Sequence, residues 1–282
     1  MSELRDRFGR HMRLKGFADK TQESYERAVV DLVREYRVSP EQLSQEQIQA
    51  HLDRLICERH LAWSTVNVHC SALQCFYGEL LKRPGTQFSL PPRGRARKRP
   101  TVLDRATLGR ILEAPRNLKH RALLALVYGS GLRVSEVVRL KVHHIESAPD
   151  RRVVRVEQGK GRKDRYTLLA DRSLELLRAY WRQYRPTEWL FFGFDRTRPM
   201  SKGTAQRIYY LACAAAGVKN VHGIHGLRHA FATHLLEQGT DLLVIKDCLG
   251  HSALSTTAGY CHLTADRLGR VRSPLDTLGE QV

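Results

Sequence analysis

The stretch RPGTQFSLPPRGRARKRPT, residues 83–101, limits how the chain can fold more than any other segment. It contains four prolines, two glycines and no acidic residue, and five of its basic residues follow Pro92. The pair Pro91-Pro92 disfavours regular helix, and repulsion between like charges keeps such a segment extended. We therefore predict an interdomain linker at residues 86–100, with one domain at residues 1–85 and a second at residues 101–282.

The first domain is predicted to be a small helical bundle. Apolar side chains recur at three- and four-residue spacing, which is typical of helices that bury one face. One helix is expected over residues 20–38 and another over residues 64–82. A further helix is predicted to begin at Ser39, because Ser39-Pro40 has the form of an N-cap followed by a helix-compatible proline. With a helix in residues 4–16, the domain has about four helices and no strand.

The second domain is predicted to be mainly helical with a small β-sheet. Helices are expected at residues 104–114, 120–131, 173–184, 203–217, 227–239 and 241–250. Gly239 and Gly250 stand where a residue that ends a helix belongs. Residues 151–170 give the only strong strand–turn–strand pattern, around Gly159 and Gly161. The predicted fold class is therefore mainly α with a small β-sheet (α+β), in two domains.

The charge of the chain points to a polyanionic partner. The formal net charge is +18, and the excess lies in the linker and the second domain. A basic excess of this size is most often matched by nucleic acid. The alternative is a basic protein without such a partner.

Other classes are disfavoured by composition. No run of about 18 apolar residues occurs, so no membrane span is expected. The N-terminal residues lack the apolar segment of a signal peptide, which predicts that the protein is not exported. The six cysteines are scattered without a Cys-x-x-Cys pair, so neither a disulfide framework nor a zinc knuckle is indicated. A cytoplasmic location is expected.

A set of basic and nucleophilic residues is suited to phosphate chemistry. Arginine forks grip phosphate oxygens in pairs and neutralise their charge, as the phosphorane formed from a DNA phosphodiester requires. One of these residues, Arg133, follows a glycine turn, where the chain can approach a ligand closely. Each residue taken singly also has a structural reading, in packing, capping or surface ion pairs. The candidate catalytic residues are Arg133, Lys160, His225, Arg228, His251 and Tyr260.

Three further interpretations concern residues that lie close in the sequence to members of this set. Lys163 competes with Lys160 for the same role. Glu136 follows Arg133 by about one helical turn and either holds that region in place or is a solvated carboxylate. His225 and His229 have the spacing of a zinc protease pair, but Gly226 stands where the catalytic glutamate belongs, so metal hydrolysis is disfavoured.

The stretch GKGRKD was also tested as a phosphate-binding P-loop. It fails this test, because Val154 and Gly161 stand where that motif needs glycine and a hydroxyl residue. No metal site and no cofactor is therefore expected from either motif.

In this order and spacing the six candidates resemble the tyrosine recombinase (phage integrase) family. The resemblance runs through GLRVSEVVRL, GKGRKDRYTLL, HGLRHAFATHLLEQG and LGHSALSTTAGYCHL, and spans about residues 100–268. The helical first domain looks like the core-binding domain of that family. The compact chain looks more like Xer-type and mobile-element integrases than like integrases with an added arm-binding domain.

The resemblance implies a role for each residue. Tyr260 would attack the scissile phosphate and form a 3′-phosphotyrosyl bond, with His225 as the proton acceptor. Arg133 and Arg228 would clamp the phosphate. Lys160 would protonate the departing 5′-oxygen, and His251 would hydrogen-bond the phosphate.

The implied partner is double-stranded DNA at specific recombination sites, bound by a homotetramer on two duplexes. Two other readings stay open at this point. A type IB topoisomerase shares the same active site and acts on one duplex. A non-catalytic DNA-binding protein shares the fold without turnover.

Overall fold

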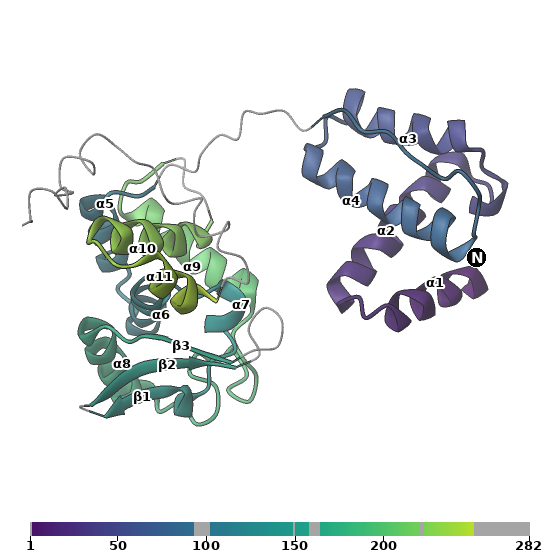
Figure 1. The fold of residues 1–282 in the computed structure, drawn as a ribbon. Helices are drawn as coiled ribbons and strands as arrows, with labels where there is room; N and C mark the ends of the chain where they lie inside the picture. The colour runs from purple at the N-terminus through teal and green to yellow at the C-terminus, as the bar shows by residue number, and fades with distance from the viewer. Residues whose placement is uncertain (1, 93–101, 149, 158–163, 220–222, 251–282) are drawn as a thin grey trace, which may run out of the picture. The chain divides into compact units, whose positions relative to one another are not determined.

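A computed structural model of the chain describes residues 2–92, 102–148, 150–157, 164–219 and 223–250. The chain divides into two compact units, residues 1–98 and residues 99–282 (Figure 1). The fold class predicted from the sequence, mainly α with a small β-sheet, is confirmed. Within the described ranges, no helix is both long and apolar enough to cross a membrane.

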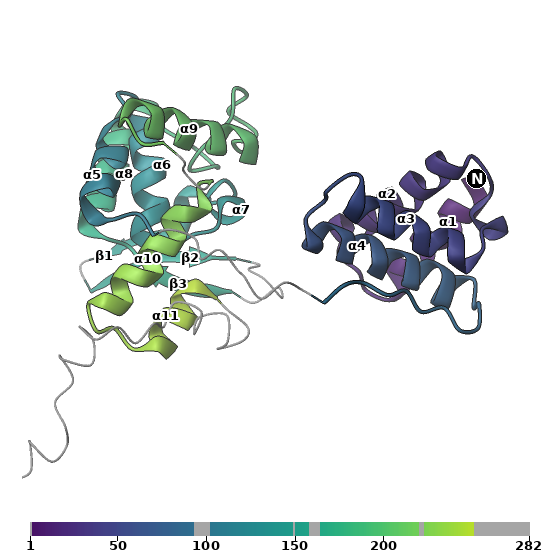
Figure 2. The ribbon, with the colours of Figure 1, turned by 90° about the horizontal axis from the view of Figure 1, so that it is seen from above.

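Helices alone build the described part of the first unit (Figure 2). They are α1 (Ser2–Leu14), α2 (Asp19–Tyr36), α3 (Gln45–Cys57) and α4 (Trp63–Leu73), which runs on into the π-helical segment η2 (Gln74–Leu80). The helix α2 packs against α1 and α4, and α3 packs against α4. The apolar residues at helical spacing form its core, in which Leu32, Leu52 and Phe76 are buried. As predicted, residues 2–92 contain no strand.

The helix that we predicted from Ser39 begins six residues later, so this prediction was wrong. Residues Pro40–Gln42 form a short 3-10 segment, η1, and the α-helix starts at Gln45. The Ser44 hydroxyl accepts the N–H of Gln47 at 3.3 Å, and the Gln47 side chain accepts the N–H of Ser44 at 2.8 Å. This reciprocal capping box satisfies two backbone donors. The Ser39 side chain makes no capping bond.

Residues 86–92 run along the first unit and are held by it. Phe88 is buried, and Gln49 exchanges two hydrogen bonds of 2.9 Å with the backbone of Ser89. The indole N–H of Trp63 donates to the carbonyl of Pro91 at 2.9 Å. The start of the predicted linker is thus anchored as far as Pro91, and the basic residues 93–99 lie outside the described residues.

The second unit packs its helices around α6 (Leu118–Ser130), most of whose side chains are buried. This helix contacts α8 (Asp171–Tyr184) and α10 (His225–Glu237). A β-carbon at Gly129 would lie 2.7 Å from the hydroxyl of Ser173, so the glycine allows α6 and α8 to approach closely. The other helices are α5 (Arg105–Glu113), α7 (Val134–Val137), η3 (Val142–His144), α9 (Lys202–Ala215) and α11 (Leu242–Leu249).

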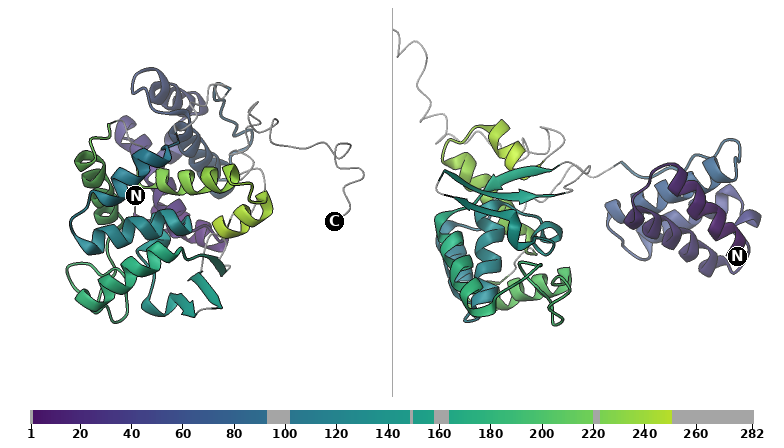
Figure 3. Two further views of the ribbon diagram at one scale, coloured as in Figure 1. Left: turned by 90° about the vertical axis from the view of Figure 1, so that its left-hand side faces the viewer. Right: turned by 90° about the horizontal axis from the view of Figure 1, so that it is seen from below.

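A three-stranded antiparallel sheet lies beside these helices (Figure 3). The predicted strand pair is confirmed as β2 (Arg151–Val156) and β3 (Arg165–Leu168), with Val156 opposite Arg165. A strand that the sequence did not predict, β1 (Ile145–Ala148), pairs with β2. Its four residues are too few to show an alternating pattern. In β3, Arg165 and Thr167 are the less exposed alternate residues, and α11 packs against this strand.

Candidate active site

Three of the six predicted site residues lie in the described part of the chain, all in the second unit. Arg133 precedes α7, and His225 and Arg228 belong to the first turn of α10. Lys160, the rival Lys163, His251 and Tyr260 lie outside the described residues. Their roles stay predictions from the sequence.

Arg133 is placed by the turn that ends α6. Gly131 has a left-handed backbone with φ of 61°, and a β-carbon there would lie 2.4 Å from Cδ1 of Phe231 on α10. Only glycine combines that backbone with so close an approach. The turn therefore brings Arg133 next to the first turn of α10, which carries Arg228.

Glu136, for which the sequence left two readings open, is not a solvated carboxylate. Its side chain is 8% exposed and accepts the backbone N–H of Arg133 at 2.8 Å and Nη1 of Arg133 at 2.7 Å. Nη1 and Nη2 of Arg165 donate two further bonds of 2.9 Å. Burial raises the pKa of Glu136, but the hydrogen bonds and charge of Arg165, and then those of Arg133, outweigh burial and lower the pKa to about 2. Glu136 is therefore ionised at neutral pH.

Arg228 is the largest fully buried side chain of the described residues, with 1% exposure. Its Nη1 donates to the carbonyl of Gly131 at 2.7 Å and its Nη2 to the carbonyl of Leu249 at 2.6 Å. Nη1 also lies 3.8 Å from a carboxylate oxygen of Glu136. Arg228 thus joins the end of α6 to the end of α11. A phosphate can reach its guanidinium only if the atoms that cover it move.

His225 is set up to accept a proton. Its ring meets the ring of His229 edge to face, with centroids 4.7 Å apart. Desolvation lowers the pKa of His225 to about 4, and the positive charges of His229, Arg228 and Arg133 act in the same direction. The residue nevertheless keeps an exposed surface. It is therefore neutral at pH 7 and remains accessible to a ligand.

Arg165 belongs to the same cluster and was missed by the sequence analysis. Besides its two bonds to Glu136, its Nε donates to the carbonyl of Cys248 at 2.9 Å. Figure 1 shows α7, β3 and the end of α11, which carry these groups, meeting at one corner of the unit. The available signal was alternation in β3, since Arg165 shares a face with Thr167, whose hydroxyl is buried against the carbonyl of Ser130.

The charges of this cluster suit a phosphate. Arg133, Arg165 and Arg228 surround one carboxylate, so a formal surplus of two positive charges remains. A phosphodiester carries one negative charge, and the pentavalent phosphorane formed from it carries about two, which a preorganised positive site stabilises. Beside Arg133 lies an open groove of about 520 Å³, with Arg139 and Lys141 on its wall. The wall also carries Glu136 and Glu157, so charges of both signs line the groove.

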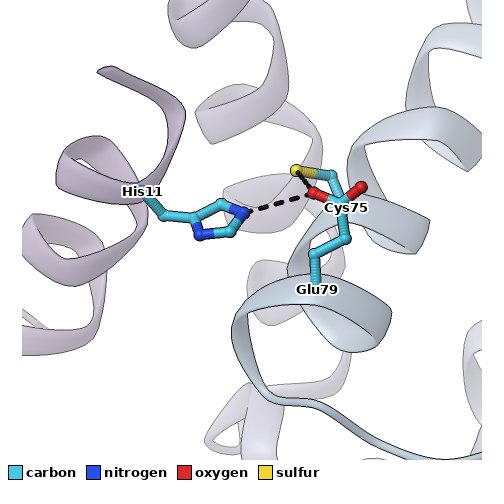
Figure 4. Close-up of side chains that lie close together, drawn as sticks. All are labelled: His11, Cys75 and Glu79. Carbon is cyan, nitrogen blue, oxygen red and sulfur yellow. Dashed lines mark hydrogen bonds and ion pairs between the residues drawn. The ribbon is translucent and has the colours of Figure 1, made fainter. Parts of the chain in front are cut away.

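Among the described residues, two groups of side chains have donor atoms close enough to be tested as metal ligands. Figure 4 shows the first, in which the ring of His11 and the thiol of Cys75 both point at the carboxylate of Glu79, at 3.2 and 3.3 Å. The ammonium of Lys15 pairs with the same carboxylate. Burial and then Glu79 raise the pKa of Cys75 to about 12, which opposes a metal-binding thiolate. Hydrogen bonds therefore account for this group.

The second group is His143, His144 and Glu157. Nδ1 of His144 accepts the backbone N–H of Lys141 at 3.1 Å, so the tautomer assigned from this bond carries its proton on Nε2. That nitrogen faces the carboxylate of Glu157 at 3.4 Å and is a donor, not a metal ligand. This group, like the first, is explained without an ion.

Two family models match the chain. The model described as the Phage integrase family matches residues 101–267. The model described as Phage integrase, N-terminal SAM-like domain, matches residues 4–87. Residues 88–100, within the proline-rich basic segment, separate the two matches.

Individual relatives match over most of their length. A putative integrase/recombinase of Sinorhizobium fredii, y4qK, is 37% identical over 281 residues, which cover 99% of this chain and 90% of the relative. The tyrosine recombinase XerC of Halalkalibacterium halodurans is 33% identical over 240 residues, 77% of each protein. A solved lambda integrase dimer bound to a core site aligns with a TM-score of 0.71 at 19% identity, over 91% of this chain and 96% of that one. This last likeness concerns the fold.

Proposed function

The chain belongs to the phage integrase family of tyrosine recombinases, and we propose that Tyr260 is the nucleophile with which it cuts and rejoins DNA strands. It is a site-specific DNA recombinase, and the relatives that it matches over most of their length are named putative integrase/recombinase and tyrosine recombinase. The observation that carries the proposal is the arginine cluster around Glu136, with its positive surplus beside a neutral His225.

In the proposed reaction, the Tyr260 oxygen attacks the scissile phosphorus and the bond from phosphorus to the 5′-oxygen breaks. The products are a 3′-phosphotyrosyl link and a free 5′-hydroxyl. Attack by the 5′-hydroxyl of a second strand reverses the step and exchanges strands. The covalent link conserves the energy of the phosphodiester, so rejoining requires no ATP.

Proton transfer from the nucleophile is assigned to His225. A tyrosine hydroxyl has a pKa of about 10 and becomes a good nucleophile only with a base and a positive field beside it. The lowered pKa of His225 keeps its ring unprotonated at pH 7, as a base must be. Arg133 and Arg228 supply the field and clamp the phosphate oxygens.

The leaving group and the remaining phosphate contact are assigned to two residues outside the described ranges. Lys160 protonates the departing 5′-oxygen, and its place between β2 and β3 puts it five residues before Arg165 in the sequence. His251 hydrogen-bonds the phosphate, and it directly follows Gly250, whose carbonyl lies 3.4 Å from Nη2 of Arg133.

The proposed partner is double-stranded DNA at specific sites, held by four protomers on two duplexes. Residues 1–85 act as the core-binding domain and residues 101–282 as the catalytic domain, with the basic linker on the DNA backbone. Such contacts go mainly to phosphates, so binding weakens steeply with salt. We place the protein in the reducing cytoplasm, where the five described cysteines, all free thiols, stay reduced.

The covalent intermediate is the direct test. The DNA sequence that the protein protects is mapped first, and a duplex of that sequence with a nick beside the cleavage site then traps the protein on the DNA. Wild type and the control Tyr210→Phe, an exposed tyrosine of α9, should give a covalent protein–DNA band. Tyr260→Phe should bind the DNA and give none. A covalent band with Tyr260→Phe would overturn the assignment.

The same assay separates the two alternatives. A DNA-binding protein without turnover gives no band with wild type. A topoisomerase of type IB gives a band but relaxes plasmids as a monomer without a specific site. The family relatives, named integrases and recombinases, favour neither alternative.

A further inference from the structure

Arg165 bonds both to the two oxygens of Glu136 and to the end of α11. Its Nη1 and Nη2 donate to the two oxygens of Glu136, each at 2.9 Å, and its Nε donates to the carbonyl of Cys248 at 2.9 Å. Its side chain is 10% exposed. This fork-to-fork geometry is the strong form of an arginine–carboxylate pair.

The bonding of Arg165 argues against direct contact with DNA. Each of its three nitrogens already donates to an acceptor of the protein, whereas Nη2 of Arg133 has only a long contact of 3.4 Å to the carbonyl of Gly250. The Arg133 side chain is also more open, at 22% exposure. A phosphate therefore meets Arg133 first, and Arg165 would have to release Glu136 in order to bind one.

The charge balance shows what Arg165 does for its neighbours. Glu136 lies within ion-pair distance of all three arginines, and among the described residues it is their shared carboxylate. Because Arg165 occupies both of its oxygens, Glu136 stays 3.8 Å from Arg228 and does not close on it. Without Arg165, the carboxylate would be left to Arg133 and Arg228, and its negative charge would cancel part of the field intended for the phosphate.

The Arg165 guanidinium also links two parts of the chain that carry proposed catalytic residues, namely the start of β3 and the end of α11. It lies at the start of β3, five residues after Lys160, and holds the carbonyl of Cys248, three residues before His251. A β-carbon on Gly250 would lie 2.7 Å from Cδ of Arg165, so the chain that leaves α11 rests directly on this side chain.

We propose that Arg165 is a positioning residue for DNA cleavage: it holds both oxygens of Glu136 so that Arg133 remains available to the phosphate, and it holds the end of α11 against β3. This role rests on the proposed function of the site. It predicts that Arg165 affects the rate of the chemical step at saturating DNA and leaves DNA affinity unchanged.

The first test compares Arg165→Met and Arg165→Lys with wild type on the nicked substrate. Misplacing reacting groups by about 1 Å costs roughly 100-fold, so Arg165→Met should cleave about 10- to 100-fold more slowly at saturating DNA. Arg165→Lys keeps the charge without the fork and should be intermediate. The slope of log Kd against log salt should not change, whereas losing a phosphate contact reduces it by about 1.

A second pair of variants leaves Arg165 in the chain. Gly250→Ala puts a β-carbon against Arg165 on a backbone with φ of 63°, and Gly239→Ala puts one on a backbone with φ of 87° where no atom lies within 4 Å. Both carry the strain of a left-handed alanine. Gly250→Ala should therefore cleave about 10-fold or more slowly, and Gly239→Ala should cleave like wild type.

The following results would overturn the positioning role of Arg165 or the proposed function. Wild-type cleavage by Arg165→Met, or a reduced salt slope, overturns the positioning role. If Arg165→Met does not fold, equal cleavage rates for Gly250→Ala and Gly239→Ala overturn it instead. If wild type itself forms no covalent complex, the proposed function fails, and this role with it. A normal wild-type band with unaffected variants refutes the role of Arg165 alone.

Discussion

Glu136 holds Arg133 twice: its carboxylate accepts the backbone N–H at 2.8 Å and the guanidinium Nη1 at 2.7 Å. The first bond caps the N-terminus of α7, where unpaired amides favour a negative group. The second fixes the direction of the guanidinium. The position of a proposed phosphate ligand is therefore tied to the cap of a helix of only four residues.

Replacing Glu136 by glutamine should lower stability in a pH-dependent way. The folded pKa is about 2, below the ordinary 4.5, so the carboxylate stabilises the fold fully above pH 4.5 and loses this effect as pH falls through 2. The shift corresponds to roughly 3 kcal/mol of unfolding free energy. Urea titrations followed by tryptophan fluorescence measure this free energy in a Trp63→Phe background. The remaining tryptophans, Trp181 and Trp189, then report on the unfolding of the second unit alone.

The matched control is Glu146→Gln. Glu146 pairs with Arg151 at 2.8 Å, but that arginine is half exposed, so this pair contributes at most about 1 kcal/mol. The difference between wild type and Glu136→Gln should be largest above pH 5 and should close toward pH 2. A difference that stays constant down to pH 2 would show that the charge of Glu136 is not what stabilises the site.

His225 should determine how the cleavage rate falls as the pH is lowered. A base must be unprotonated, and the pKa of His225 is lowered from 6.5 to about 4 in the free protein. A bound phosphate opposes this shift, so the midpoint of the acid limb should lie between these values. Single-turnover cleavage measured from pH 8 to pH 4.5 checks it. A midpoint at or above 6.5 would contradict the combined effect of desolvation, His229 and the arginines on this ring.

Removing the His225 ring should slow the same step strongly. Loss of a general base costs about 10²- to 10⁴-fold, so His225→Ala should show a loss in this range. The control is His234→Gln, because His234 is buried and bonds the hydroxyl of Tyr128 at 3.0 Å, away from the arginine cluster. His234→Gln should lower stability and leave the cleavage rate of the folded protein near that of wild type.

Lys160 and Lys163 should differ sharply in the cleavage assay. If Lys160 protonates the 5′-oxygen, Lys160→Ala slows cleavage by about 10²-fold or more, and Lys163→Ala changes it little. A substrate with a 5′-bridging sulfur removes the need for the acid, because thiolate leaves without a proton, and should restore cleavage by Lys160→Ala. The opposite order of the two variants would assign the acid to Lys163.

Gly131 should tolerate no side chain. Alanine at this position would bring its β-carbon to 2.4 Å from the ring of Phe231, on a backbone with φ of 61°. The control Gly217→Ala has φ of 70° and no atom within 4 Å. Thermal unfolding should show a loss of about 1 kcal/mol for Gly217→Ala, from backbone strain alone. Gly131→Ala should lose several kcal/mol in total, because overpacking adds about 1–3 kcal/mol. Equal losses would contradict the close approach of α6 and α10.

Much of the fold was predictable because its signals are local. Helical periodicity, the αL glycines Gly131 and Gly250 and the alternation in β2 and β3 depend on neighbours within a few positions. Where two local signals competed, the outcome was harder to predict. Ser39-Pro40 looked like a helix start, yet the helix is capped by Ser44, five residues after Ser39, in a capping box with Gln47.

The site shows the same division. The sequence by itself determined the family, and it identified Arg133, His225 and Arg228 as candidate site residues, because motif order and spacing can be read directly from the chain. Only the tertiary structure decided that Glu136 is buried and that Arg165 belongs with it. Their bonds join residues 29 positions apart, and those of Arg228 reach Gly131 across 97. Whether a charged side chain is solvated or paired depends on which distant elements pack around it. The alternation in β3 indicates the face on which Arg165 lies, but not that Glu136 is its partner.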